Sequence, residues 1–349
     1  MLVVLAAILV MMLSNPEVKN FFLDAESVKL DFQTGIDYDM VTYGKNMLLV
    51  NNEGISAIDK SGREVWNIVC AATRPAVLVR GDFIMLSDMN GKNVRTFEKE
   101  KTVAQIQTKN EILCSKVNKN GYIAVATDEL GYKGLVTLYD KNGSELFKWH
   151  SGAGYIGDID ILSKQKIAVS QILTNKEKVL SRILIIEPDS EEEPLCIAEL
   201  EGIVMKLCYR DNGSLVAVSE NGLYGFKKNG KPDFSVSFEG RTPIGCNIEN
   251  QGNMVFAFDS GLNSTVLESY SAGGKLRGSY NSNNQIKVFD VNGECIVAVS
   301  PDGIVKLNPK GEVKKKTSLS KDVQKIRIFS SRDRFLSLGG SSAEIIKFR

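Results

Sequence analysis

Asp158 and Asp160 are the two residues of this sequence whose type and spacing come closest to hydrolytic chemistry. They lie in the segment Asp158 to Leu162, which alternates like a strand, so both carboxylates face one side, about 6.5 Å apart along it. Paired carboxylates at such separations serve glycoside hydrolysis. Nothing else in the sequence marks a sugar site, and the interpretation that we favour is a polar stripe beside the channel of a ring-shaped fold.

A literal Gly-x-Gly-x-x-Gly pattern precedes these aspartates, from Gly152 to Gly157. In a dinucleotide-binding fold, a helix must follow such glycines so that the pyrophosphate meets the helix N-terminus. Here the following residues alternate like a strand instead. We therefore expect a connection between two structural repeats and no nucleotide cofactor.

The sequence also gives little support for a nucleophilic catalytic site or a metal site. His150 is the only histidine, which excludes a multi-histidine metal site, and no Gly-x-Ser-x-Gly elbow accompanies it. The segment Asp88 to Asn93 is similar to a calcium loop but lacks its carboxylates and its closing glutamate, so we expect a plain turn. The sequence predicts an exposed, isolated histidine, no catalytic residues, no metal and no cofactor.

The elements that position these residues repeat about every 40 residues. The clearest repeats run from Gly54 to Trp66 and from Gly134 to Trp149, where two apolar strands flank a tight turn. Weaker copies cover residues 222–238, 266–280 and 303–319, and degenerate copies turn near Lys99-Glu100 and Asp189 to Glu193. Two more short strands precede each copy. Four strands per repeat, without amphipathic helices between them, predict an all-β propeller.

Eight such strand sets are present, and the eighth is incomplete. The last set has only three strands, whereas an extra strand, Ser27 to Phe32, precedes the first. We expect this strand to complete the eighth blade beside Ala343 to Phe348, because closing the ring removes two exposed sheet edges. Residues 25–349 then form one eight-bladed domain. The sets start near Asp37, Pro75, Ile112, Tyr155, Val204, Ile244, Ile286 and Val323.

The N-terminus is apolar without interruption from Met1 to Leu13. As a helix it covers roughly 20 Å of the ~30 Å hydrocarbon core. It lacks the basic flank and the cleavage pattern of a signal peptide. We expect residues 1–24 to be a membrane anchor and linker; a start further upstream would explain the short span, and a buried element of the fold is the alternative. The propeller would then lie outside the cytoplasm at the cell membrane, as a monomeric domain.

The amino-acid composition argues against one class of partner and one class of metal site. The chain of 349 residues has 43 Lys and Arg against 42 Asp and Glu, and this balance argues against nucleic acid. None of the six cysteines forms a Cys-x-x-Cys pair, so a zinc ribbon is excluded. Most lie in or beside apolar runs, and we expect small buried side chains, although the spacing leaves one or two disulfides open.

The hairpins resemble those of a known family. Ala57-x-Asp59-x-Ser61-Gly62-x-x-x-Trp66 resembles the repeat of quinoprotein-like (PQQ-like) propellers, although it is one residue shorter between Asp59 and Gly62. Asp140, Gly143 and Trp149 form a looser copy, and the adjacent cysteine pair usual in the quinone enzymes is missing. The layout also resembles uncharacterised bacterial membrane-anchored propellers, with similar stretches at 121–134 and 148–152. This resemblance implies an extracytoplasmic domain and no catalytic residues.

Two classes of function remain, besides a purely structural role in an envelope assembly. The first is a non-catalytic, membrane-tethered module that binds a protein or an envelope polymer. The alternative is an enzyme of quinoprotein or sugar-cleaving type with its site at the channel mouth. In a propeller, the loops from an outer strand to the next inner strand open onto one face, and there an aromatic residue and arginines are typical interface anchors. Ordinary solvated loops are the competing interpretation. The candidate binding residues are Arg74, Tyr155, Arg241, Asn281 and Asn283.

Overall fold

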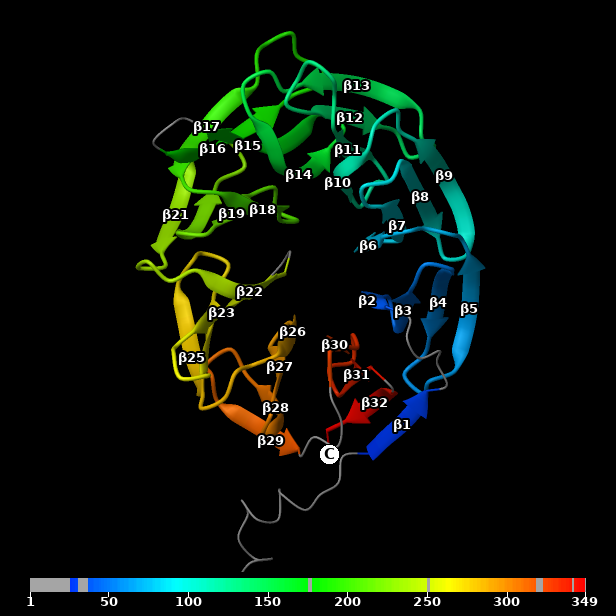
Figure 1. Ribbon diagram of the computed structural model, residues 1–349, viewed down its shortest axis with the longest axis vertical. Helices are drawn as coiled ribbons and strands as arrows, with labels where there is room; N and C mark the ends of the chain where they lie inside the picture. The colour runs from blue at the N-terminus through cyan, green and yellow to red at the C-terminus, as the bar shows by residue number, and fades with distance from the viewer. Residues whose placement is uncertain are drawn as a thin grey trace, which may run out of the picture.

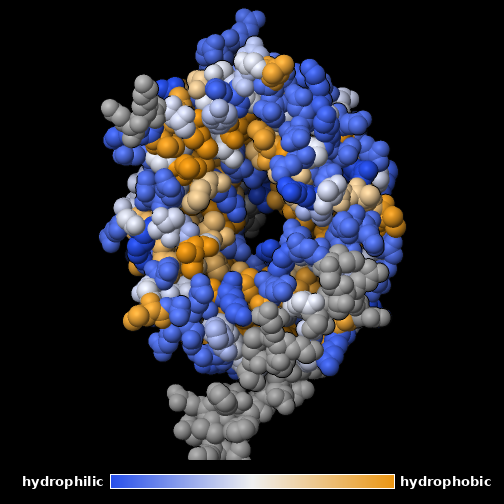
Figure 2. Space-filling view, viewed as in Figure 1, coloured by the Kyte–Doolittle hydropathy of each residue, from blue (hydrophilic) through white to orange (hydrophobic). Residues whose placement is uncertain are grey.

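The protein is a ring of eight four-stranded antiparallel sheets, here called blades 1 to 8. The computed structural model describes residues 26–30, 37–174, 178–249, 252–317, 323–340 and 342–348, and all their regular elements are strands. Figure 1 shows the blades arranged around a centre, and Figure 2 shows an opening through it. The prediction of an all-β, eight-bladed propeller is confirmed.

Each of the first seven blades uses four consecutive strands, from the channel outwards. Blade 1 has β2 (Asp39–Tyr43), β3 (Asn46–Val50), β4 (Gly54–Ile58) and β5 (Glu64–Val69). Blade 2 has β6 (Pro75–Arg80), β7 (Phe83–Asp88), β8 (Asn93–Glu98) and β9 (Lys101–Gln107). Blade 3 has β10 (Ile112–Val117), β11 (Ile123–Thr127), β12 (Leu135–Tyr139) and β13 (Glu145–His150). Blade 4 has β14 (Tyr155–Ser163), β15 (Lys166–Thr174), β16 (Val179–Ile186) and β17 (Leu195–Glu201).

The second half of the ring continues the pattern. Blade 5 has β18 (Val204–Tyr209), β19 (Leu215–Ser219), β20 (Gly222–Phe226) and β21 (Pro232–Ser237). Blade 6 has β22 (Pro243–Ile248), β23 (Met254–Asp259), β24 (Thr265–Tyr270) and β25 (Leu276–Ser282). Blade 7 has β26 (Val288–Asn292), β27 (Cys295–Ser300), β28 (Gly303–Leu307) and β29 (Val313–Thr317). Blade 8 combines β30 (Lys325–Ile328), β31 (Arg334–Leu338) and β32 (Ala343–Lys347) with the N-terminal β1 (Glu26–Leu30).

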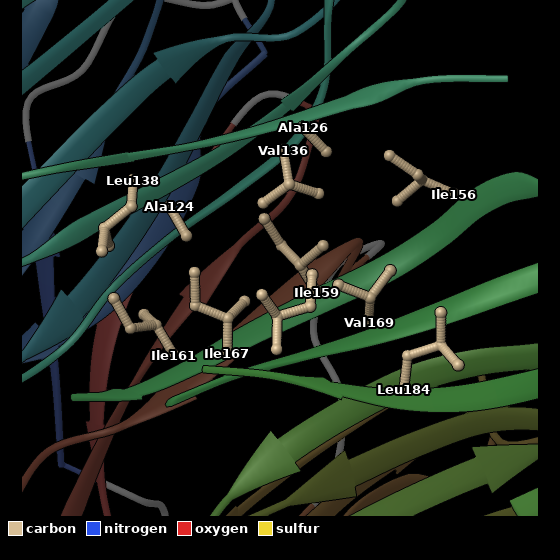
Figure 3. Close-up of a cluster of buried hydrophobic side chains, with 11 residues drawn as sticks. Ala124, Ala126, Val136, Leu138, Ile156, Ile159, Ile161, Ile167, Val169 and Leu184 are labelled. Atoms are coloured by element: carbon tan, nitrogen blue, oxygen red, sulfur yellow. The ribbon is translucent and has the colours of Figure 1, made fainter. Parts of the chain in front are cut away.

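The hydrophobic core lies between the blades. Every residue of the second strands β11 and β19 is buried, because neighbouring blades cover both faces of the sheet. The outer strands β5 and β13 alternate between exposed and half-buried residues instead, because only one of their faces is covered. Figure 3 shows the apolar cluster between blades 3 and 4, in which Val136 and Leu138 face Ile159 and Ile161. Burial on two faces explains the short, continuous apolar runs of the sequence.

The N-terminal strand closes the ring as predicted. β1 pairs with β32 in antiparallel register, with Val28 opposite Ile345 and Leu30 opposite Ala343. Val28 and Leu30 also pack against the apolar cluster between blades 8 and 1. The strand begins at Glu26, one residue before the predicted start, and the last two residues of the prediction lie outside the described residues.

In five blades, a turn with glycine at its fourth position lets the hairpin touch the preceding blade. In blades 1 and 3 the first residue of this turn is Asp59 or Asp140. In blade 1, Asp59 Oδ1 accepts the backbone N–H groups of Ser61 (2.8 Å) and Arg63 (3.1 Å). Gly62 then adopts φ +86°, and a Cβ atom there would lie 2.5 Å from Leu30 of blade 8. Glycine is required because it tolerates this φ and leaves the space that the neighbouring blade fills.

The hydrophobic segment from Met1 to Leu13 lies outside the described residues, so the predicted anchor stays a prediction. Within the part of the chain that the structure describes, no helix is long and apolar enough to cross a membrane.

Removal of β1 should expose a sheet edge and destabilise the ring. We expect a variant lacking residues 1–30 to aggregate or to melt at a lower temperature, because β32 loses its partner and the cluster between blades 8 and 1 loses Val28 and Leu30. Removal of residues 1–24 alone is the matched control and should leave the melting temperature unchanged. Equal melting of both variants, measured by calorimetry with light scattering, would contradict closure by β1.

Candidate functional site

The two aspartates with the strongest hydrolytic pattern hold blades together. Asp158 and Asp160 are 7% and 4% exposed on the inner strand β14. Their Oδ2 atoms accept the backbone N–H groups of Leu207 (2.8 Å) and Tyr209 (2.5 Å) on β18 of blade 5. Lys116 of blade 3 completes the link with an ion pair to Asp158 at 3.2 Å. Both carboxylates are engaged in hydrogen bonds between blades, and Asp158 also in an ion pair. This supports the interpretation as a polar stripe over that of a sugar-cleaving pair.

A third buried aspartate does the same across the ring. Asp290 of blade 7 accepts hydrogen bonds from Arg327 (2.8 Å) and from the backbone N–H of Ile328 (2.7 Å) in blade 8. It also accepts one from Asn247 of blade 6 at 3.0 Å. The sequence analysis missed Asp290, although a lone acid inside the apolar strand Val288–Asn292 is a signal that could have found it.

Burial raises the pKa of two of these acids, Asp160 and Asp290. Desolvation raises the pKa of Asp160, against the opposing effects of Lys116 and the Tyr209 N–H. It raises the pKa of Asp290 against the effect of Arg327. A carboxyl group whose folded pKa lies above its unfolded value makes the fold less stable as pH rises through that interval.

We therefore expect an unusual pH dependence for Asp160→Asn. As pH falls from neutral towards about 4, the wild type should gain stability relative to the variant, because the wild-type carboxyl takes up a proton in the fold first. Urea unfolding of both proteins across this range measures the difference. A difference that moves in favour of the variant on acidification would show that the buried carboxylate is a net stabilising charge.

The glycine-rich stretch and the lone histidine have structural explanations. Residues 152–154 connect β13 to β14, and a Cβ on Gly154 would lie 2.5 Å from the carbonyl oxygen of Ile172. The predicted connection between blades is confirmed for residues 152–154, whereas Gly157 lies within strand β14. His150 is exposed, as predicted, but it is not isolated: its ring packs on Tyr132 with 4.6 Å between centroids.

The calcium-like segment is a turn. Asp88 Oδ1 accepts the backbone N–H groups of Thr73 (2.9 Å) and Arg74 (2.8 Å), and Asn90 takes φ +59°. Among the described residues, no three His, Cys, Asp or Glu side chains are grouped to hold a metal ion. All six cysteines are free thiols; the expectation of burial holds for Cys70, Cys208 and Cys295, whereas Cys196 is exposed.

The five predicted binding residues lie on one face, which carries the connections from each outer strand to the next inner strand. We call it the connection face, and the opposite face the hairpin face. Arg74, Asn281 and Asn283 are exposed. Tyr155 is 52% exposed, and its hydroxyl accepts a hydrogen bond from Lys133 at 3.2 Å. The five come from four different connections, and no hydrogen bond or ion pair between described residues joins any two of them.

Arg241 differs from the other four because it is built into the fold. Its guanidinium donates two hydrogen bonds to Glu268, at 2.7 and 3.2 Å, and lies 4.2 Å above the ring of Phe258. Arg241 was predicted as an interface anchor, and these contacts already engage most of the donors of its guanidinium.

Replacing Arg241 should therefore cost stability. We expect Arg241→Ala to lower the free energy of unfolding by about 1 kcal/mol, since the variant loses a bidentate ion pair and a cation–π contact that are partly in solvent. Arg74→Ala is the matched control and should change it by less than about 0.5 kcal/mol. Equal values from chemical denaturation would show that Arg241 is a free surface residue after all.

Exposed apolar side chains form the main feature of the connection face. Fifteen large hydrophobic residues are exposed among the described residues, and nine of them lie at this face in blades 3 to 6. On the face seen in Figure 2, orange surface gathers over this half of the ring. We call the set the apolar arc: Leu113, Leu130, Tyr132, Tyr155, Val179, Ile203, Met205, Ile244 and Leu262.

Three of the loops around the apolar arc lack charge, whereas the loops at residues 128–133 and 238–242 carry charged side chains. Residues 151–154, 202–203 and 260–264 contain no charged side chain, whereas the hairpin face has charged turns such as 59–63, 187–194 and 227–231. Sequence reasoning found only Tyr155 of this set. The signal available was the contrast between uncharged loops and charged hairpin turns.

Leu262 is the most exposed member of the arc. It lies at the tip of the β23–β24 hairpin, 101% exposed, with φ +49°. A bulky residue in the left-handed region is uncommon and costs about 1 kcal/mol. A strained, fully solvated leucine contributes nothing to folding, which points to a use outside the isolated chain.

Comparison with known proteins identifies the family of this chain but no activity. Residues 25–348 match the model of a family described as a family of unknown function, DUF5711. No curated protein has a significant sequence match to this chain.

Solved structures with the same fold are numerous. BamB from Moraxella catarrhalis is similar with a TM-score of 0.57 and 11% identity, over 92% of this chain and 98% of that one. Sqt1 from Saccharomyces cerevisiae has a TM-score of 0.62 and 11% identity, over 93% and 99% of the two chains. The Dos1 propeller has a TM-score of 0.59 and 10% identity, over 92% and 95%. At such identities the likeness shows the propeller fold alone, and the quinoprotein-like repeat stays a prediction.

Proposed function

Because the chain belongs to DUF5711, a family of unknown function, we propose its role from the structure: a non-catalytic module that binds a protein partner through the apolar arc. The observation that carries the proposal is the concentration of exposed apolar side chains on one half of one face. Exposed apolar patches of this extent mark interaction surfaces.

A protein suits this surface better than a small molecule. The arc extends over four blades, whereas a small molecule would contact far fewer residues. Tyr132 and Tyr155, each about half exposed, are of the residue type that dominates interface energetics. Lys133 lies 4.7 Å above the Tyr155 ring and supplies a cation beside them. We therefore expect a partner segment with apolar side chains and a carboxylate.

Tethering at the cell envelope is the second part of the proposal. Met1 to Leu13 is apolar throughout, which supports a membrane anchor. β1 starts opposite Lys347, at the hairpin face, so a tether would leave the arc pointing away from the anchored side. The alternative of an enzyme is weaker, because the paired acids at the channel are engaged in bonds between blades.

The test replaces the two most exposed leucines. The double variant Leu130→Asn, Leu262→Asn should lose partner binding while its melting temperature stays equal or rises, because asparagine tolerates the φ of residue 262. A photo-crosslinking amino acid at position 155, in full-length protein in native membranes, identifies the captured partner. The partner is then purified and titrated against each variant.

Val313→Asn is the matched control. Val313 is 49% exposed on the outer strand β29 and lies outside the arc, so binding should be unchanged. Full binding by the leucine double variant would overturn the proposal, as would capture of an envelope polymer in place of a protein.

A further inference from the structure

A cleft between blades 4 and 5 opens on the hairpin face, away from the apolar arc. Its outer part is a polar basin of about 610 Å³, lined among others by Lys166, Glu187, Asp189 and Lys228. Its inner part is a narrow cavity of about 80 Å³ that shares Lys166, Glu187 and Lys228 with the basin. The two parts therefore form one continuous site with a polar mouth and a deep end.

The cleft lies where the repeat departs from its pattern. The turn between β4 and β5 has five residues, 59–63, whereas the connection between β16 and β17 has eight, 187–194. This longer loop lacks the Asp-x-x-Gly turn and leaves Leu195, at the mouth of the inner cavity, 60% exposed. Departures from a regular repeat are where function is expected, because the fold does not require them.

The deep end combines apolar walls with one buried hydroxyl group. Ile185, Ile197, Leu215 and Phe226 line the inner cavity. Tyr209 also lines it, is 7% exposed, and its buried hydroxyl oxygen has no hydrogen-bond partner. Burial, Asp160 and Glu187 raise the pKa of this tyrosine, so it remains a donor at physiological pH. A buried hydroxyl without a partner is costly, and a ligand that accepts its hydrogen bond would recover that cost.

The mouth favours a cation. Glu187 pairs with Lys166 at 3.3 Å, whereas Asp189 accepts a hydrogen bond from the neutral amide of Gln165 at 3.1 Å. Glu191, Glu192 and Glu193 follow in the same loop and are exposed. The outer basin is lined by Glu187, Asp189 and Asp211 against Lys166 and Lys228, so negative charge is in excess there and attracts a positively charged group. The inner cavity, lined by Lys166, Lys227, Lys228 and Glu187, does not share this excess.

We propose that this cleft binds a short aliphatic amine whose other end carries a hydroxyl or carbonyl oxygen. The ammonium group lies in the basin near Asp189, and the oxygen accepts a hydrogen bond from Tyr209. The chain between them packs on Ile185 and Leu215. A cavity of about 150 Å³ holds benzene, so the inner cavity of about 80 Å³ selects a slender chain over a ring.

Four probes of similar size separate these contributions. 5-Amino-1-pentanol has both groups, pentylamine lacks the acceptor, 1,5-pentanediol lacks the cation, and 5-hydroxypentanoate reverses the charge. We expect 5-amino-1-pentanol to bind most tightly and the carboxylate most weakly, by ligand-observed NMR titration of the full chain. Added salt should weaken binding of the two amines and leave the diol unchanged.

Two substitutions test the proposed contacts of the ligand with Tyr209 and with Asp189. Tyr209→Phe should weaken 5-amino-1-pentanol about fivefold to tenfold and leave pentylamine unchanged, since only the hydrogen bond is lost. The same variant should melt at an equal or higher temperature, because it removes a hydroxyl without a partner. Asp189→Asn should weaken both amines about twofold to fivefold, whereas Glu111→Gln on the connection face is the matched control and should change neither.

Equal affinity for all four probes, or the absence of saturable binding to the wild type, would overturn the proposal. An unchanged affinity of Tyr209→Phe for 5-amino-1-pentanol would do so as well, with the hydroxyl then satisfied by water alone. Since the cleft and the apolar arc share no residue, these results leave the proposed protein-binding function untouched.

Discussion

Apolar packing between neighbouring blades is the interaction on which the rest of this structure depends. Each four-stranded sheet buries its inner strands only when a blade covers each face, so no blade is stable alone. The ring must therefore close, and β1 closes it by pairing with β32 from the far end of the chain. Eight apolar clusters, one between each pair of successive blades, result from this single requirement.

Closure also explains the polar residues near the channel. Inner strands of adjacent blades are not paired in one sheet, so their backbone N–H groups need other partners. Asp158, Asp160 and Asp290 supply carboxylate oxygens to Leu207, Tyr209 and Ile328 in the next blade. Burial raises the pKa values of Asp160 and Asp290 for these structural reasons. Perturbed acids at the centre of a propeller are therefore weak grounds for assigning catalysis.

The two faces of the ring present different chemistry because their loops have different tasks. Turns on the hairpin face pack against the preceding blade. Polar side chains such as that of Asp59 stabilise these turns by accepting hydrogen bonds from backbone N–H groups of the same turn. Loops on the connection face join one blade to the next, or join the second strand of a blade to its third, as at Leu130 and Leu262. Their side chains are free of that packing task, and Leu130 and Leu262 extend into solvent. The longest turn on the hairpin face, residues 187–194 in blade 4, lines the cleft between blades 4 and 5.

The architecture could be predicted from the sequence, because period, strand alternation and turn residues are local properties that recur along the chain. The sequence also predicted closure by the strand near Ser27, since a three-stranded last repeat leaves one partner missing. The roles of individual side chains depend on contacts that form only in the folded ring. Arg241 was predicted as an interface anchor, and Glu268 and Phe258, distant in sequence, hold it in place. Of the apolar arc, sequence reasoning found only Tyr155, and it found no residue of the pocket around Tyr209. Each is assembled from separate blades, and exposure depends on which neighbours the ring brings into contact.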